Sequence, residues 1–158
     1  MKNKVVTFVI PSSAAKAYQG LANKYAAVEP PTWALLLANV VRTESYEPCI
    51  LDFDAEPATD EDASEKIADT QCELAVFVLY GQNPNSGTTM MIGGTALAKQ
   101  LKKSHPNIKI AFIGSHASAM PHQTISFPFI DFVFINEGVY GLLELLKTNF
   151  KDELDKVS

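Results

Sequence analysis

The chain has 158 residues, of which 47% are hydrophobic and 20% charged, a balance typical of one globular domain with a sizeable core. Its net charge of -5 argues against nucleic acid as a partner, because nucleic-acid binders concentrate Lys and Arg on one face. No stretch approaches the roughly 20 apolar residues of a membrane span, and the charged start does not match a signal peptide. We therefore expect no membrane partner and a cytoplasmic location.

The two cysteines, Cys49 and Cys72, lie in or beside apolar runs and far from any Cys-x-x-Cys spacing. Neither a structural zinc site nor an iron-sulfur cluster fits, because the three histidines are not spaced with these cysteines to complete a ligand set. We expect free thiols and no metal ligated by side chains of this chain.

Five apolar segments predict strands, which in chain order span residues 5–10, 46–53, 74–80, 108–113 and 129–135. Several are apolar on both faces, as in parallel strands that are covered by helices on both sides. Helices are expected between them, at residues 33–43, 56–70, 88–103 and 139–147. The alternation predicts an α/β fold, a doubly wound, flavodoxin-like (Rossmann-like) sheet of five parallel strands. Residues 1–148 would form the domain, and residues 149–158 a charged tail or the start of a linker.

Three segments depart from this simple alternation. Residues 12–31 are too long for a βα loop, and residues 14–22 could form a short helix there. After the fourth strand and Gly114-Ser115-His116, residues 117–122 are followed by a short irregular segment that ends at Pro128. The helix at 33–43 is apolar almost all round, which predicts a position between the sheet and another layer. Gly93-Gly94 inside a helix predicts close packing against the sheet or against a ligand.

In open parallel sheets, ligands bind outside the carboxyl ends of the strands, so we expect the site where the loops after the strands meet. Those loops carry hydroxyls, amides and glycines and few charges, a composition that suits holding a large polar ligand better than catalysis. Within them the candidate residues are Ser12, Ser13, Tyr80, Gly81, Gln82, Asn83, Ser86, Gly87, Thr88, Gly114, Ser115, His116, Glu137 and Gly138.

Two other functions on this fold are disfavoured by the residues present. Hydrolysis would need a serine nucleophile, but the Gly-x-Ser-x-Gly elbow is absent. A phosphorylated receiver domain needs acidic residues after the first and third strands, where this chain has Pro11-Ser12 and Tyr80-Gly81. A flavin mononucleotide carrier stays open as an alternative, because Ser12-Ser13 offers a weak phosphate-binding loop.

Four motifs occur in a recognisable order: Pro11-Ser12 after the first strand, Pro30-Pro31 before the first long helix, Gly114-Ser115-His116 after the fourth strand, and the run from Asp131 to Gly138. Each is weak alone. Together they resemble the cobalamin (B12)-binding domain of B12-dependent radical S-adenosylmethionine (SAM) enzymes, from Val5 to about Leu146.

The resemblance implies that a corrin ring lies on the carboxyl edge of the sheet, lined by the candidate residues above, with its nucleotide tail between the sheet and its helices. The chain would act as the cobalamin-binding module of a radical SAM methyltransferase-type enzyme, without catalysing a reaction by itself. The iron-sulfur cluster and S-adenosylmethionine would belong to a radical SAM partner domain, in cis or in trans, because the chain lacks Cys-x-x-x-Cys-x-x-Cys.

The sequence departs from other cobalamin domains after the first strand. Those of methionine synthase and the mutases carry Asp-x-His-x-x-Gly there, whose histidine ligates cobalt, whereas this chain has Ser12 to Lys16. We therefore expect no histidine ligand from that loop, and His116 to be a hydrogen-bonding wall of the pocket or a capped loop residue. The alternative is a flavodoxin-like module that binds a flavin or a protein partner, for example through Tyr18 to Tyr25, without cobalamin.

Overall fold

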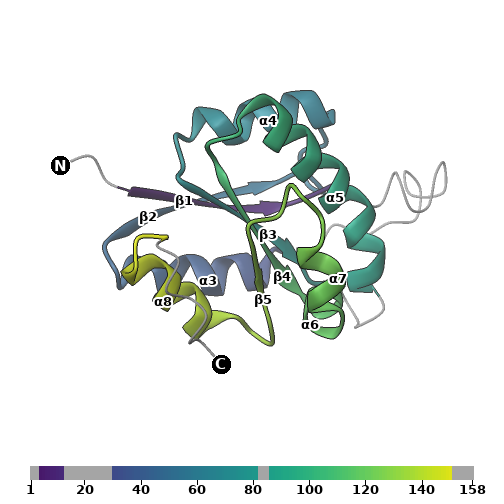
Figure 1. The fold of residues 1–158 in the computed structure, drawn as a ribbon. Coiled ribbons are helices and arrows are strands. Elements are labelled where there is room, and N and C mark those ends of the chain that lie inside the picture. Colours follow the sequence, from purple (N-terminus) through teal and green to yellow (C-terminus); the bar gives the residue numbers. More distant parts are fainter. Residues whose placement is uncertain (1–3, 13–29, 82–85, 151–158) are drawn as a thin grey trace.

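The computed structural model describes residues 4–12, 30–81 and 86–150 (Figure 1). Within these residues the elements follow in the order β1 (Lys4–Ile10), α3 (Thr32–Arg42), β2 (Tyr46–Asp52), α4 (Asp60–Asp69), β3 (Leu74–Leu79), α5 (Ser86–Ser104), β4 (Lys109–Gly114), α6 (Ser115–Ala119), α7 (Pro121–Ile125), β5 (Phe132–Phe134) and α8 (Val139–Lys147).

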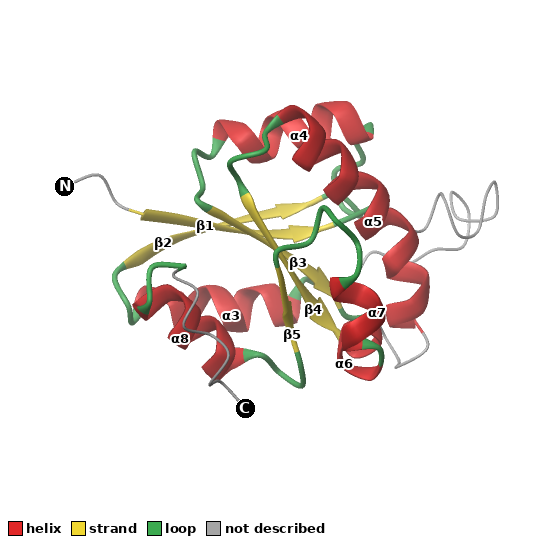
Figure 2. Ribbon diagram, viewed as in Figure 1, coloured by secondary structure: helices red, strands yellow, loops and turns green. Residues whose placement is uncertain are grey.

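The five strands form one parallel sheet in the order β2-β1-β3-β4-β5. This is the flavodoxin-like order, so the predicted fold class is confirmed. Helices α3 and α8 cover one face, and α4 and α5 cover the other (Figure 2). The switch in strand order lies between β1 and β3, as expected for a doubly wound sheet.

The inner strands are buried because helices cover both of their faces. All six residues of β3 are buried, and in β4 only Lys109 is exposed. Phe77 of β3 stacks on Phe112 of β4 with ring centroids 5.1 Å apart. The apolar run at residues 108–113 therefore forms an inner strand, as its lack of alternation predicts.

A capping residue fixes the start of α4, and a glycine lets α5 pack closely on the sheet. Thr59 caps α4, since its hydroxyl accepts a hydrogen bond from the Asp62 N–H at 3.1 Å. In α5, a Cβ added to Gly94 would lie 2.9 Å from Leu79 Cδ2. The predicted close packing against the sheet is thus confirmed at Gly94.

The outer face of α3 differs from the prediction. Ala34, Leu37 and Val41 are buried, but Leu35 and Leu36 are 53% and 54% exposed. Within the described part of the chain, α3 is covered on its sheet side only. A helix that is apolar all round was expected to have a second layer outside it, and that layer is not among these residues.

The segment after β4 is also more regular than predicted. Two short helices, α6 and α7, follow β4, and α7 continues to Ile125, into the segment after His122 that was expected to be irregular. Pro121 begins α7 because proline suits the first turn of a helix. The last strand shortens to Phe132–Phe134, because a turn closed by the Ile130 N–H and the Phe127 carbonyl precedes it. The short helix expected at 14–22 lies outside the described residues.

Asp131 joins β4, α5 and β5 at the amino end of the sheet. Its carboxylate accepts hydrogen bonds from Lys102 Nζ at 2.7 Å and from the Ile110 N–H at 2.8 Å, and Lys109 Nζ lies 3.5 Å away. We expect Asp131→Ala to lower the free energy of unfolding by about 2 kcal/mol, because it leaves a partly buried ammonium and a backbone N–H without their acceptor.

Urea denaturation would measure this loss, with Glu144→Ala as the control. Glu144 pairs with Lys147 at 3.0 Å on the exposed surface of α8, where an ion pair contributes less than about 1 kcal/mol. Equal midpoints for the two variants would show that Asp131 does not hold these elements together.

Candidate functional site

The loops that follow the strands meet at one edge of the sheet, because all the strands run in the same direction. The structure brings together Ser12 after β1, Tyr80 and Gly81 after β3, Ser115 and His116 after β4, and Glu137 and Gly138 after β5. Gly87 and Thr88 join them from the start of α5. Ser13, Gln82 and Asn83 lie outside the described residues, and Ser86 is placed only by its backbone at the first position of α5.

Positions 87 and 114 require glycine because neighbouring atoms of the protein leave no space for a Cβ. A Cβ at Gly87 would collide with Ser115 Oγ and lie 3.2 Å from the His116 nitrogen. A Cβ at Gly114 would lie 2.7 Å from the Leu79 carbonyl carbon in the neighbouring strand. Both glycines are therefore needed for packing within the fold, and a bulky residue at either position would disturb the fold itself. Their assignment to the ligand site stays a prediction.

Thr88 and His116 form one wall of the edge. Thr88 Oγ1 lies 3.1 Å from His116 Nδ1, so a hydrogen bond joins the first turn of α5 to α6. His116 is the second residue of α6 and is half-buried. This contact matches the predicted hydrogen-bonding role of His116, because Nδ1 is engaged by a hydroxyl.

Tyr80 forms the opposite wall together with two residues that the sequence did not single out. Its ring stacks on Trp33 at the start of α3, with centroids 4.5 Å apart and planes 24° apart. Its hydroxyl donates a 2.6 Å hydrogen bond to the carbonyl of Asn136, in the turn after β5. We call Trp33, Tyr80 and Asn136 the aromatic clasp, because they join α3, the end of β3 and the β5-α8 turn.

The Tyr80 phenol stays protonated as the donor of this clasp. Burial raises the pKa of Tyr80 above its usual value, and the nearby Glu137 carboxylate raises it further. Both effects disfavour the phenolate, so the hydroxyl keeps its proton throughout the physiological pH range.

The β5-α8 turn is held in an unusual backbone conformation. Asn136 and Gly138 have φ of 54° and 64°, in the left-handed region, and the Gly138 N–H donates to the Ile135 carbonyl at 3.1 Å. A Cβ on Gly138 would lie 2.8 Å from Phe134 Cβ. Gly138 is thus needed where the chain turns from β5 into α8, which positions Glu137 at the exposed rim.

The sequence contained an ambiguous indication for Trp33 and none for Asn136. Trp33 follows Pro30-Pro31 at the start of a helix that was predicted to be apolar almost all round, so the sequence predicted no particular contact for it. In the structure it is 37% exposed and stacked on Tyr80. The asparagine side chain of Asn136 suggested nothing by itself, because it is the backbone carbonyl that Tyr80 uses.

Asp52, at the end of β2, is held by the turn that follows the strand. Its carboxylate accepts hydrogen bonds from the Asp54 and Ala55 N–H groups at 3.0 and 3.2 Å, so it closes this turn.

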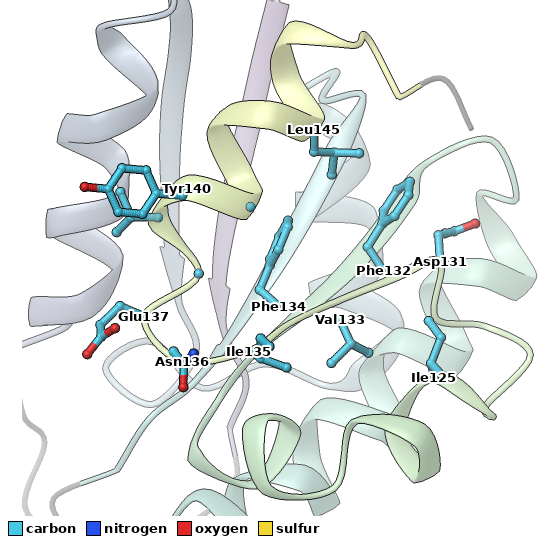
Figure 3. Close-up of a pocket in the computed structure, with 13 residues that line it drawn as sticks. Ile125, Asp131, Phe132, Val133, Phe134, Ile135, Asn136, Glu137, Tyr140 and Leu145 are labelled. Carbon is cyan, nitrogen blue, oxygen red and sulfur yellow. The ribbon is translucent and has the colours of Figure 1, made fainter. Parts of the chain in front are cut away.

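A cavity of about 710 Å³ lies beside β5 and includes one corner of the edge (Figure 3). We call it the β5 groove; β5, the turn at 135–138 and the first turns of α8 line it, together with Ile125 and Asp131. Figure 3 shows Phe132, Phe134 and Leu145 on its α8 side and Val133 and Ile125 on the other. Glu137 and Gly138 are the only predicted site residues among those that line this groove.

Metal-ligand clusters and membrane helices were also sought in residues 4–12, 30–81 and 86–150. Nowhere in these ranges do three or more His, Cys, Asp or Glu side chains gather as a metal site would need. None of the helices described in these ranges has the length and apolar character needed to cross a membrane. Cys49 is half-buried and Cys72 buried, and both are free thiols as predicted.

The residues of the edge fit a large ligand rich in amide groups. The described residues offer hydroxyls from Ser12 and Thr88, the exposed backbone of Gly81 and the partly exposed face of Trp33. Such groups suit the amide side chains of a corrin ring.

The comparisons with known proteins agree with this fit. The B12 binding domain family matches residues 18–146, most of the chain. Among proteins of curated function, no sequence matches it. Its structure is similar to that of the radical S-adenosylmethionine methyltransferase TsrM from Kitasatospora setae, solved with tryptophan substrate and a SAM analog, with a TM-score of 0.69 and 13% sequence identity. The similarity covers 96% of this chain and 27% of that chain. The chain belongs to the B12-binding domain family, and its cofactor is cobalamin.

Proposed function

We propose that cobalamin lies on the carboxyl edge of the sheet, between the Thr88-His116 wall and the aromatic clasp. The observation that supports this position is the meeting of the strand-end loops, which gathers the polar groups that suit a corrin ring at one edge of a fold whose ligands bind there. Glu137 and Gly138 would close the β5 end of the site, and Ser12 the β1 end.

The residues that would hold the cofactor divide into three kinds. Hydroxyls of Ser12, Ser115 and Thr88 and the imidazole of His116 would bind amide groups at the ring periphery. The exposed backbone of Gly81 would do the same, and Gln82 and Asn83, which follow it in the chain, remain candidates. Trp33 and Tyr80 would supply an apolar surface against a face of the ring, because aromatic rings combine a large contact area with defined orientation.

We propose further that no histidine of the β1 loop ligates the metal. Ser12 stands where other cobalamin domains continue toward a ligating histidine, and the described edge holds His116, whose Nδ1 is engaged by Thr88. The residues of this chain would therefore bind and orient the cofactor and exclude water from one side of it, without an imidazole ligand from β1.

The whole enzyme would be a radical SAM methyltransferase-type enzyme, and this chain its cobalamin module. The neighbouring structure is a radical SAM methyltransferase of which this chain spans 27%, so most of such an enzyme would lie in other domains. Residues 1–148 would form the module, although Phe150 also packs against the core and so extends the ordered fold slightly past that boundary. When bound, cobalamin would carry a methyl group. The iron-sulfur cluster and S-adenosylmethionine would belong to the partner domain.

Incubation of the purified chain with hydroxocobalamin, followed by removal of free ligand, tests this function. We expect corrin absorbance to stay with the protein, and a base-off spectrum would further support a nucleotide tail that is buried between the sheet and its helices. A folded protein that retains no corrin absorbance but retains flavin mononucleotide would contradict the proposal and favour the flavodoxin-like alternative.

A further inference from the structure

The two edges of the sheet are protected to different degrees. The β2 edge contains Pro48 and Glu47 and ends at Asp52, and proline and charge are the devices by which exposed strands avoid pairing. The β5 edge reads Phe132-Val133-Phe134 and continues with Ile135, without a charge or a proline inside the strand. The β5 edge is therefore the one suited to accept another strand.

The β5 groove leaves space beside this unprotected edge. Its rim carries large apolar side chains in contact with water: Ile125 is 42% exposed, Ile135 51% and Tyr140 84%. The α8 and α7 sides of the groove flank β5 on the two faces of the sheet (Figure 3). An extended segment beside β5 would cover these side chains.

The backbone of β5 has groups free to pair on this side. The Asp131 N–H donates to the Ile110 carbonyl of β4 at 2.9 Å, and Val133 is in register with Phe112. Residues that bond to the same neighbour alternate along a strand. Lys109, whose N–H donates to the Glu73 carbonyl, faces β3, so Ile110 and Phe112 face β5. Because Phe112 is in register with Val133 in a parallel ladder, it bonds to Phe132 and Phe134, and Val133 directs its N–H and C=O outward, into the groove.

We propose that the β5 groove is filled by β5 of a second copy of this chain, paired antiparallel about a two-fold axis at Val133. In this register Val133 lies opposite Val133 of the second copy, so its outward N–H and C=O groups bond across the axis, and Phe132 lies opposite Phe134 of the second copy. The same register pairs aromatic side chains across the strands, which is among the favourable cross-strand combinations.

The charges at the two ends of β5 complement each other in this arrangement. Its amino end carries Lys102 and Lys109 around the single carboxylate of Asp131, and its carboxyl end carries the exposed Glu137. Antiparallel pairing brings the acidic end of each copy beside the basic end of the other. It also directs the two carboxyl edges in opposite directions, so each edge stays accessible to its cofactor.

Sedimentation of the 158-residue chain without cofactor tests the proposal. We expect twice the monomer mass of 17.2 kDa, and dissociation to monomers in Ile135→Lys, whose ammonium would lie beside Lys102 and Lys109 of the second copy. Ile92→Lys is the matched control, because Ile92 is 50% exposed on α5 and Ile135 51% exposed. A monomeric wild-type chain, or an Ile135→Lys variant as dimeric as Ile92→Lys, would overturn the proposal.

Oxidative cross-linking tests the register separately from the mass. Val133→Cys should form a disulfide-linked dimer, because directly opposed residues of an antiparallel pair have Cα atoms about 4.5–5.5 Å apart. Ile135→Cys should not, since the two copies of residue 135 would be offset by four positions along the strand, about 13 Å. Cross-linking of Ile135→Cys but not of Val133→Cys would exclude this register. Neither measurement depends on cobalamin, so either can fail while the proposed function holds.

Discussion

Replacing Gly114 by valine is expected to destabilise the fold by about 3 kcal/mol, because the new side chain meets backbone that cannot move independently. A Cβ at this position would lie 2.7 Å from the Leu79 carbonyl carbon and 2.9 Å from Leu79 Cβ, in the adjacent strand. The neighbouring strands β3 and β4 would have to separate at their carboxyl ends, where the site is formed. We expect a midpoint of thermal unfolding lower by roughly 9 °C for a domain of this size.

Gly141→Ala provides the control for this experiment. Its Cβ would lie 3.1 Å from Phe134 Cδ1, the end of a side chain, and alanine gains up to about 1 kcal/mol over glycine within a helix. We therefore expect its stability to change by less than about 1 kcal/mol in either direction. A Gly114→Val variant that unfolds like the wild type yet fails to bind hydroxocobalamin would show that the glycine is reserved for the ligand.

Removing the indole of Trp33 is expected to weaken hydroxocobalamin binding about ten-fold, a loss of about 1.4 kcal/mol. Trp33 stacks on Tyr80, and the Tyr80 hydroxyl holds the Asn136 carbonyl at 2.6 Å, so one ring supports both the apolar wall and the turn that carries Glu137. In Trp33→Ala we expect Tyr80 to lose its fixed orientation while α3 stays folded. Absorbance titration of the corrin measures the dissociation constant.

Two further variants separate the contributions of the clasp. Leu35→Ala removes an apolar side chain that is 53% exposed on the same helix, and it should bind hydroxocobalamin like the wild type. Tyr80→Phe keeps the stack on Trp33 and removes the hydrogen bond to Asn136, so we expect a smaller loss than in Trp33→Ala. Wild-type affinity in Trp33→Ala would place the corrin ring away from the aromatic clasp.

The arrangement of the fold follows from patterns that are local in the sequence. The apolar runs of β3 and β4 are buried because helices must alternate with strands in a parallel sheet, and that alternation is visible in the chain. The edge where Tyr80, His116 and Glu137 meet follows from the strand direction alone. Secondary structure was harder to predict from the sequence after β4, because short helices such as α7 depend on a single proline and on packing against β5.

The sequence by itself determined the fold class, the edge of the site and the resemblance to the cobalamin-binding family, because strand periodicity, loop composition and motif order are properties of the chain. Only the tertiary structure decided what individual residues do. Gly114 contacts Leu79 and Trp33 stacks on Tyr80 across gaps of 35 and 47 residues, and no local pattern records such contacts. The β5 groove also exists only after folding, since an exposed edge depends on which strand lies last in the sheet.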